Sequence, residues 1–200
     1  MFDTQLRLLV DRPLNFVAIR VARVGPSADC LTLSGAMVAI GAAAAITGGY
    51  MPLALALIVA SRVFYGLDGA VARINGPTAW GGYLDSIADY VFYVSIPVAF
   101  GLAHPDNLLP ALLLVASFTI TAVSFLAFAA IAALQVQIKN DNLPKAFIYS
   151  TGLMEGGETI GFFVLFCVFP SAFPALAFTF AALCLLTVLQ RVWLASKQFA

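Results

Sequence analysis

Five ionisable side chains lie close together in an otherwise apolar part of this sequence and could act together. They are Arg62, Asp68, Arg73, Asp85 and Asp89. Asp85 and Asp89 are four residues apart, so both carboxylates would share one face of a helix. An ionisable group in the middle of a bilayer costs about 2.5–3.5 kcal/mol on insertion scales. A cluster of such groups within membrane segments therefore predicts a functional site.

Helix geometry predicts that the three acids meet at one depth. If the chain turns at Pro77, Asp68 precedes the turn by nine residues and Asp85 follows it by eight. At about 1.5 Å per residue, the two carboxylates lie roughly level, with Asp89 one turn further on. Three carboxylates in one place favour a hard divalent cation, because Mg²⁺ and Mn²⁺ prefer oxygen ligands. The pattern therefore predicts a metal site built from Asp68, Asp85 and Asp89.

Small residues flank the acids on both sides of the predicted turn. They are Gly66, Gly69, Ala70, Ala72, Gly81 and Gly82. Their lack of bulk leaves space for a large anion, such as a phosphorylated substrate, near the backbone. A second interpretation stays open, in which Asp68–Arg73 and Asp85–Arg62 form buried salt bridges in a transporter.

The composition predicts that these residues lie in a membrane protein. Hydrophobic residues make up 62% of the 200 residues and charged residues only 10%. Soluble domains contain about 45–50% apolar and about 25% charged residues. The formal net charge of zero gives no global field that would attract nucleic acid. Cys30, Cys167 and Cys184 lie in apolar runs without metal-ligand spacing and are interpreted as packing residues.

Hydropathy predicts an all-α integral membrane bundle of six transmembrane helices, because a span needs about 20 mostly apolar residues. The expected spans are 30–49, 53–74, 82–103, 108–135, 156–170 and 175–195. Residues 1–24 alternate apolar side chains with Arg and Asp, which is typical of an amphipathic interfacial helix, with a break expected at Pro13. We therefore divide the chain into a juxtamembrane segment, residues 1–24, and a six-helix domain, residues 25–200.

Lys and Arg are unevenly distributed among the predicted loops. Four arginines precede the first span, Lys139 and Lys145 lie between the fourth and fifth, and Arg191 and Lys197 close the chain. The loops near residues 50, 105 and 172 contain no Lys or Arg. The positive-inside rule then predicts an inner-membrane protein of bacterial type with both termini in the cytoplasm.

The central motif resembles a known family signature. Asp68-Gly69-x-x-Ala72-Arg73, seven residues and then Gly81-x-x-x-Asp85-x-x-x-Asp89 is similar to the signature of the CDP-alcohol phosphatidyltransferase family. The segment Pro26 to Thr32 also resembles the start of the first helix in this family. The resemblance implies transfer of a phosphatidyl group from a CDP-linked lipid, such as CDP-diacylglycerol, to an alcohol in phospholipid biosynthesis, with release of CMP.

The resemblance also implies roles for single residues. Asp68 and Asp85 match ligands of one or two Mg²⁺ or Mn²⁺ ions, and Asp89 matches the acid that accepts the proton of the acceptor alcohol and contacts metal. The positions that match the lining of the CDP site are Thr32, Gly69, Ala72, Arg73 and Gly81. The implied partners are the CDP-linked lipid, the alcohol and membrane lipids, with a homodimer left open and no nucleic acid.

Tyr65 departs from the signature, which has a further aspartate at this position. A phenol is neutral at physiological pH and is a poor ligand for Mg²⁺. An alternative function therefore stays open, namely a catalytically weakened or inactive member that binds CDP-lipid or a membrane partner. Further along the chain, Lys145, Glu155 and Glu158 are candidates for the acceptor pocket, while Lys145 could instead contact lipid headgroups.

Overall fold

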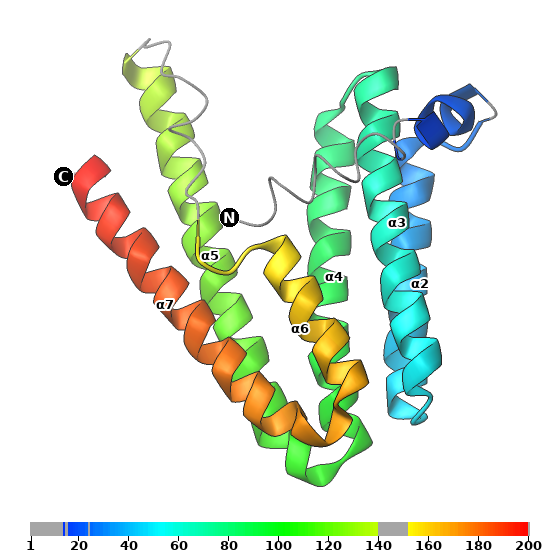
Figure 1. The fold of residues 1–200 in the computed structure, drawn as a ribbon. Coiled ribbons are helices and arrows are strands. Elements are labelled where there is room, and N and C mark those ends of the chain that lie inside the picture. The colour runs from blue at the N-terminus through cyan, green and yellow to red at the C-terminus, as the bar shows by residue number, and fades with distance from the viewer. Residues whose placement is uncertain (1–13, 15, 24, 140–151, 200) are drawn as a thin grey trace.

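The computed structural model describes residues 14, 16–23, 25–139 and 152–199, and the described part of the chain is helical without any β-strand (Figure 1). The helices are α2 (Ala28–Thr47), α3 (Met51–Asn75), α4 (Ala79–Ala103), α5 (Leu108–Lys139), α6 (Gly156–Val168) and α7 (Phe173–Phe199). Two 3-10 turns, η1 (Pro105–Asn107) and η3 (Pro170–Ala172), join α4 to α5 and α6 to α7. The expected all-α membrane bundle is confirmed.

Five of these helices are long and apolar enough to cross a bilayer, namely α2, α3, α4, α5 and α7. The sixth, α6, has 13 residues and is about 20 Å long, which is shorter than the hydrocarbon core of about 30 Å. Glu155 and Glu158 form a capping box that starts α6 at Gly156. Figure 1 shows that α6 begins about halfway along its neighbours and runs to the same end as η3.

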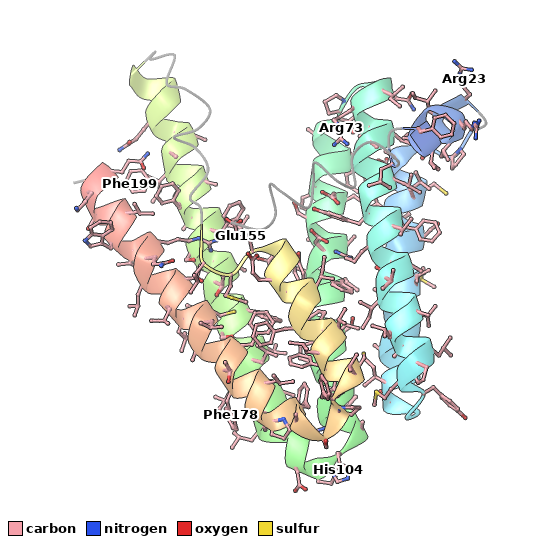
Figure 2. All side chains as sticks on the ribbon, in the orientation of Figure 1. Arg23, Arg73, His104, Glu155, Phe178 and Phe199 are labelled. Carbon is pink, nitrogen blue, oxygen red and sulfur yellow. The ribbon has the colours of Figure 1, made fainter. Side chains whose placement is uncertain are left out.

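The helices pack in two groups that share α4. Helix α2 contacts α3 and α4, while α5 contacts α4 and α7. Helix α6 contacts α3 and α7. Figure 2 places Arg23 and Arg73 at one end of the bundle, His104 at the opposite end and Glu155 between them. The hairpin of α3 and α4 therefore carries its turn at the end that holds Arg73.

Phenylalanine rings form the core where α4, α5, α6 and α7 meet. The fully buried rings are Phe92, Phe100, Phe163, Phe166, Phe173 and Phe180. Phe100 stacks on Phe173 with 4.6 Å between ring centroids, and Phe162 stacks on Phe180 at 4.3 Å. Each buried aromatic side chain removes a large apolar area from its surroundings and fixes ring geometry. This packing fixes one half of α4 in the bundle. The other half of the helix carries Asp85 and Asp89.

The helix of residues 16–23 lies against α3 beside the acids. Ala18 is completely buried in a cluster with Leu67 and Val71 of α3, while Phe16 is 59% exposed. Leu14 contacts the backbone at Gly66, where an added Cβ atom would come within 2.7 Å of its Cδ1. The amphipathic character expected for this segment stays a prediction, as does its location at the membrane interface. The break expected at Pro13 lies outside the described residues.

Candidate functional site

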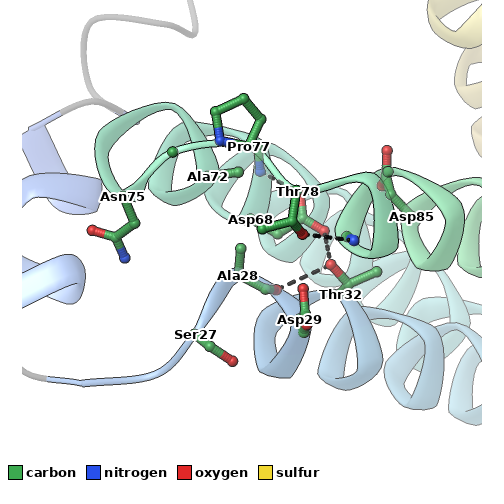
Figure 3. A pocket seen from close by; sticks show the side chains of 14 residues that line it. Ser27, Ala28, Asp29, Thr32, Asp68, Ala72, Asn75, Pro77, Thr78 and Asp85 are labelled. Atoms are coloured by element: carbon green, nitrogen blue, oxygen red, sulfur yellow. Dashed lines mark hydrogen bonds between the residues drawn. The ribbon is translucent and has the colours of Figure 1, made fainter.

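A tight turn between α3 and α4 sets the register of the site. Gly76 ends α3 with a φ of 95°, a conformation that a residue with a side chain rarely adopts. Thr78 then starts α4, and its side chain accepts a hydrogen bond of 2.9 Å from the backbone N–H of Gly81. The hairpin predicted from residue counting is therefore formed, with Asp68 on one arm and Asp85 on the other (Figure 3).

Asp68 is buried, with 4% of its surface exposed. Thr32 of α2 donates a hydrogen bond of 2.7 Å from Oγ1 to Oδ2 of Asp68. The backbone N–H of Gly69 donates to Oδ1. Both oxygens are thus oriented by fixed donors, and each keeps a lone pair for a further partner. The resemblance implies that Thr32 lies near the nucleotide. In the structure its hydroxyl orients the Asp68 carboxylate.

Asp85 provides the test of whether a metal ion suits this site. Its Oδ1 is buried and has no hydrogen-bond partner among the described residues. A buried carboxylate oxygen without a partner is uncommon and calls for a ligand. Asp68 and Asp89 lie close enough to interact electrostatically with Asp85. Within the described ranges, no three acidic, histidine or cysteine side chains are close enough to enclose a metal ion by themselves.

Two carboxylates nevertheless fit a hard divalent cation. Mg²⁺ is usually bound by one or two carboxylates, with substrate phosphates and water filling the remaining positions. Asp68 and Asp85 are the acids of the cluster that no described cation neutralises directly. We therefore regard these two residues as the fitting ligands, and the assignment stays a proposal.

Asp89 forms a salt bridge with an arginine of the neighbouring helix. Arg62 of α3 donates from Nη1 to its Oδ1 over 2.9 Å, and the two side chains are only 13% and 16% exposed. The Cζ atom of Arg62 lies 3.7 Å from the ring centroid of Phe92 and 4.9 Å from that of Tyr65. The salt-bridge interpretation paired Arg62 with Asp85, whereas the structure pairs it with Asp89.

A cavity of about 370 Å³ opens beside Asp68 and Asp85 (Figure 3). The residues expected at the CDP group that line it are Thr32, Gly69, Ala72 and Gly81. Arg73 is not among its lining residues; a Cβ atom added at Gly69 would lie 3.6 Å from Nη1 of Arg73. Asp68 and Asp85 line the cavity together with these small residues.

Asp29 also lines this cavity and was missed by sequence reasoning. A Cβ atom added at Gly81 would lie 3.2 Å from Oδ1 of Asp29 and 3.0 Å from Oγ1 of Thr78. Glycine at position 81 therefore keeps this side of the cavity open. The available signal was the spacing of three residues between Asp29 and Thr32, which places both on one helix face.

A second cavity of about 400 Å³ is lined by residues of α4, α5, α6 and α7. Its polar lining includes Ser86, Asp89, Tyr90, Glu155 and Arg191. Glu155, a candidate for the acceptor pocket, therefore lines a cavity next to Asp89. Glu158 instead accepts a hydrogen bond of 3.2 Å from the backbone N–H of Glu155 and is not among the lining residues. Lys145 and the loop that contains it lie outside the described residues.

Arg191 is the second functional candidate that sequence reasoning missed. The sequence places it near the end of the expected span 175–195, among the charges that close the chain, yet only 7% of its surface is exposed. Its Nη1 donates to the carbonyl of Thr121 over 3.0 Å and to Oγ of Ser124 over 3.2 Å. Its Nε is buried without a hydrogen-bond partner in the described part of the chain. The second cavity therefore holds a buried cation.

Fold and site together define an integral membrane helical bundle with an acidic site between two cavities. The chain belongs to the CDP-alcohol phosphatidyltransferase family, whose sequence profile matches residues 27–196. This confirms the resemblance inferred from the motif. Family membership also supports a metal-dependent phosphatidyltransferase activity in general, in phospholipid biosynthesis.

Two curated proteins illustrate the range of relatives. Inner membrane protein YnjF of Escherichia coli (strain K12) is 43% identical over 196 residues, covering 96% of this chain and 94% of that protein. Archaetidylinositol phosphate synthase of Methanothermobacter thermautotrophicus is 42% identical over 86 residues, covering 42% of this chain and 43% of that protein. The name of the first relative agrees with an integral membrane protein.

Solved structures of phosphatidylinositol phosphate synthase (PgsA1) from Mycobacterium tuberculosis share the fold. The complex with CDP-DAG has a TM-score of 0.73 at 19% identity, covering 91% of this chain and 92% of that one. The complex with manganese and citrate has a TM-score of 0.72 at 20% identity, with 90% and 87% covered. At these identities the likeness establishes a common fold.

Proposed function

We propose that this protein transfers a phosphatidyl group from a CDP-linked lipid to an alcohol and releases CMP. The observation that carries the proposal is the position of the acids between two cavities. Asp85 lines the first cavity and Asp89 the second, and one helical turn places them about 5–6 Å apart on α4. A donor in the first cavity and an acceptor in the second would meet at this turn.

Asp68 and Asp85 would hold the divalent ion, Mg²⁺ or Mn²⁺. When bound, this ion would neutralise the diphosphate of the CDP-lipid and the charge that develops on the leaving CMP. The chain prepares the site by fixing Asp68 through Thr32 and the Gly69 N–H. Thr32, Gly69, Ala72 and Gly81 line the space for the CDP group, with Arg73 close to Gly69.

Asp89 is the proposed general base. Its Oδ1 accepts a hydrogen bond from Arg62, and the Tyr65 hydroxyl also hydrogen-bonds this carboxylate; the carboxylate would take the proton of the acceptor hydroxyl. The hydroxyl oxygen forms a bond to the phosphorus atom of the phosphatidyl group. The bond between that phosphorus and the CMP oxygen breaks, and CMP leaves with its electron pair. Arg62 keeps Asp89 oriented during these steps.

The second cavity is the proposed acceptor site. Arg191 supplies a buried positive charge there, and Asp89 and Glu155 supply carboxylates that accept hydrogen bonds from hydroxyls. This combination favours an alcohol that also carries an anionic group, such as a polyol phosphate. The names of the archaeal synthase and the mycobacterial synthase point to inositol phosphate chemistry in relatives. We therefore place a polyol phosphate ahead of a neutral alcohol.

We place the site at the cytoplasmic face of the membrane. Arg23 and Arg73 lie at the same end of the bundle (Figure 2), and the last turn of α7 with Lys197 points toward that end (Figure 1). The positive-inside rule assigns such an end to the cytoplasm. Both termini would then be cytoplasmic, and the acids would be reached from that side.

A panel of acceptors tests the proposal. Purified protein receives CDP-diacylglycerol, Mn²⁺ and one of inositol 1-phosphate, glycerol 3-phosphate, inositol, glycerol or serine, and CMP release is measured. We expect release with a phosphorylated polyol. Tyr65 favours a second candidate, an inactive member that only binds CDP-lipid. Binding of CDP-diacylglycerol without CMP release for every acceptor would support that candidate.

A further inference from the structure

The geometry points to Arg62 as a built-in cation of the acidic cluster. We propose that its guanidinium neutralises the Asp89 side and limits the substrate-free protein to one divalent ion, held on the Asp68–Asp85 side. The inference deepens the proposed function and rests on the metal site proposed there. It concerns a residue outside the family signature.

Arg62 is fixed in the cluster by contacts in several directions. Its Nη1 donates to Asp89 over 2.9 Å and its Nη2 donates to Oγ of Ser61 over 3.3 Å. Ser61 is itself completely buried and donates to the carbonyl of Gly35 over 2.9 Å. The guanidinium also lies 3.7 Å from the ring centroid of Phe92, a contact that favours a cation over an aromatic face.

The space next to this guanidinium is small and already bordered by positive charge. A cavity of about 10 Å³ is lined by Arg62, Tyr65, Asp68 and Asp89, among others. Such a volume holds about one water molecule. An arginine side chain stays protonated in proteins. A divalent ion in this cavity would therefore face a permanent positive charge at short range, which opposes its binding.

The charge balance of the cluster leads to the same conclusion. Asp29, Asp68, Asp85 and Asp89 carry four negative charges, and Arg62 and Arg73 carry two positive ones. One divalent ion balances the remaining two negative charges in the substrate-free protein, whereas a second ion would leave an excess of two positive charges. Tyr65 supplies a neutral phenol where a further carboxylate would have offset part of that excess.

The number of bound ions tests this proposal directly. Mn²⁺ is titrated into the purified protein in nanodiscs without CDP-lipid, and free Mn²⁺ is counted by electron paramagnetic resonance. We expect the parent chain to bind one ion. Tyr65→Asp alone keeps the guanidinium and should also bind one. The double variant Arg62→Met/Tyr65→Asp removes a positive charge, adds a carboxylate and should bind two.

Arg20→Met is the matched control, because Arg20 is exposed on the helix of residues 16–23 and stacks on Phe16. It should bind one ion, like the parent. Two ions on the parent, or none, would overturn the proposal, as would two on Tyr65→Asp or one on a folded double variant. The parent count decides the matter even if the double variant does not fold. CMP release is measured separately, so a parent with two ions and full activity would contradict only this inference.

Discussion

Thr32 on α2 donates a hydrogen bond of 2.7 Å to the carboxylate of Asp68 on α3, and both side chains are buried. This bond joins α2 to the proposed metal site. Asp68, Asp85 and Asp89 themselves lie in α3 and α4. The first prediction follows from this relationship.

Thr32→Val removes the hydroxyl while keeping the shape of the side chain. Loss of a partner that orients a metal ligand typically costs about 10–100-fold in metal affinity or activity. We expect Mn²⁺ affinity to fall by about tenfold in an isothermal titration. Thr32→Ser retains the hydroxyl and should stay near the parent. Equal affinities for the Val and Ser variants would show that the hydrogen bond does not prepare Asp68 for metal.

Tyr65→Asp adds a carboxylate beside Asp89. Hard divalent ions prefer anionic oxygen, so we expect several-fold tighter binding of the single Mn²⁺ ion and faster CMP release. Tyr65→Phe adds no charge but removes the hydroxyl that hydrogen-bonds Asp89, so it separates the effect of losing that hydroxyl from the effect of the added carboxylate. If Tyr65→Asp binds metal no better and is less active than the parent, Tyr65 is a functional part of this site rather than a missing ligand.

Arg191→Gln removes the buried cation of the second cavity. A hydrogen bond to a charged group contributes about 1.5–3 kcal/mol, so the KM for an anionic acceptor should rise about tenfold or more. The KM for CDP-diacylglycerol should stay unchanged, because Arg191 is not among the residues that line the first cavity. Lys197→Gln, at the exposed end of α7, is the matched control. A rise in both KM values would argue for a general structural role of Arg191.

Much of the site could be predicted from the sequence because helix geometry is regular. Counting residues on either side of Pro77 placed Asp68 opposite Asp85, and the turn at Gly76 forms as that count requires. Hydropathy located the long helices for the same reason, since a span needs a fixed length of apolar chain.

Side-chain pairing and burial could not be predicted in the same way. Asp85 and Asp89 share a helix face, and a long arginine reaches either, so the sequence did not decide that Arg62 pairs with Asp89. Arg191 lies inside the expected span 175–195 but was counted only among the charges that close the chain, because the sequence does not show that this face of α7 is turned into the bundle.

The orientation in the membrane is tested by reporter fusions. Fusions after Gly49 and His104 should report the external side, and fusions after Gly76 and Lys145 the cytoplasm, because Lys and Arg flank the latter positions. A fusion at the turn of Gly76 tests the access of the site itself. A cytoplasmic signal after His104 would contradict the assignment of both termini to the cytoplasm.

The most direct test of the central claim is CMP release from CDP-diacylglycerol by the parent chain and by Asp85→Asn, measured side by side with Mn²⁺ and inositol 1-phosphate. The amide keeps the size of the side chain but removes the charge that the proposed ion requires. We predict Mn²⁺-dependent release by the parent and a loss of at least about 100-fold in Asp85→Asn, in Asp68→Asn and in Asp89→Asn. Each variant should still insert and purify like the parent. Full activity of a folded Asp85→Asn variant would contradict the proposed site.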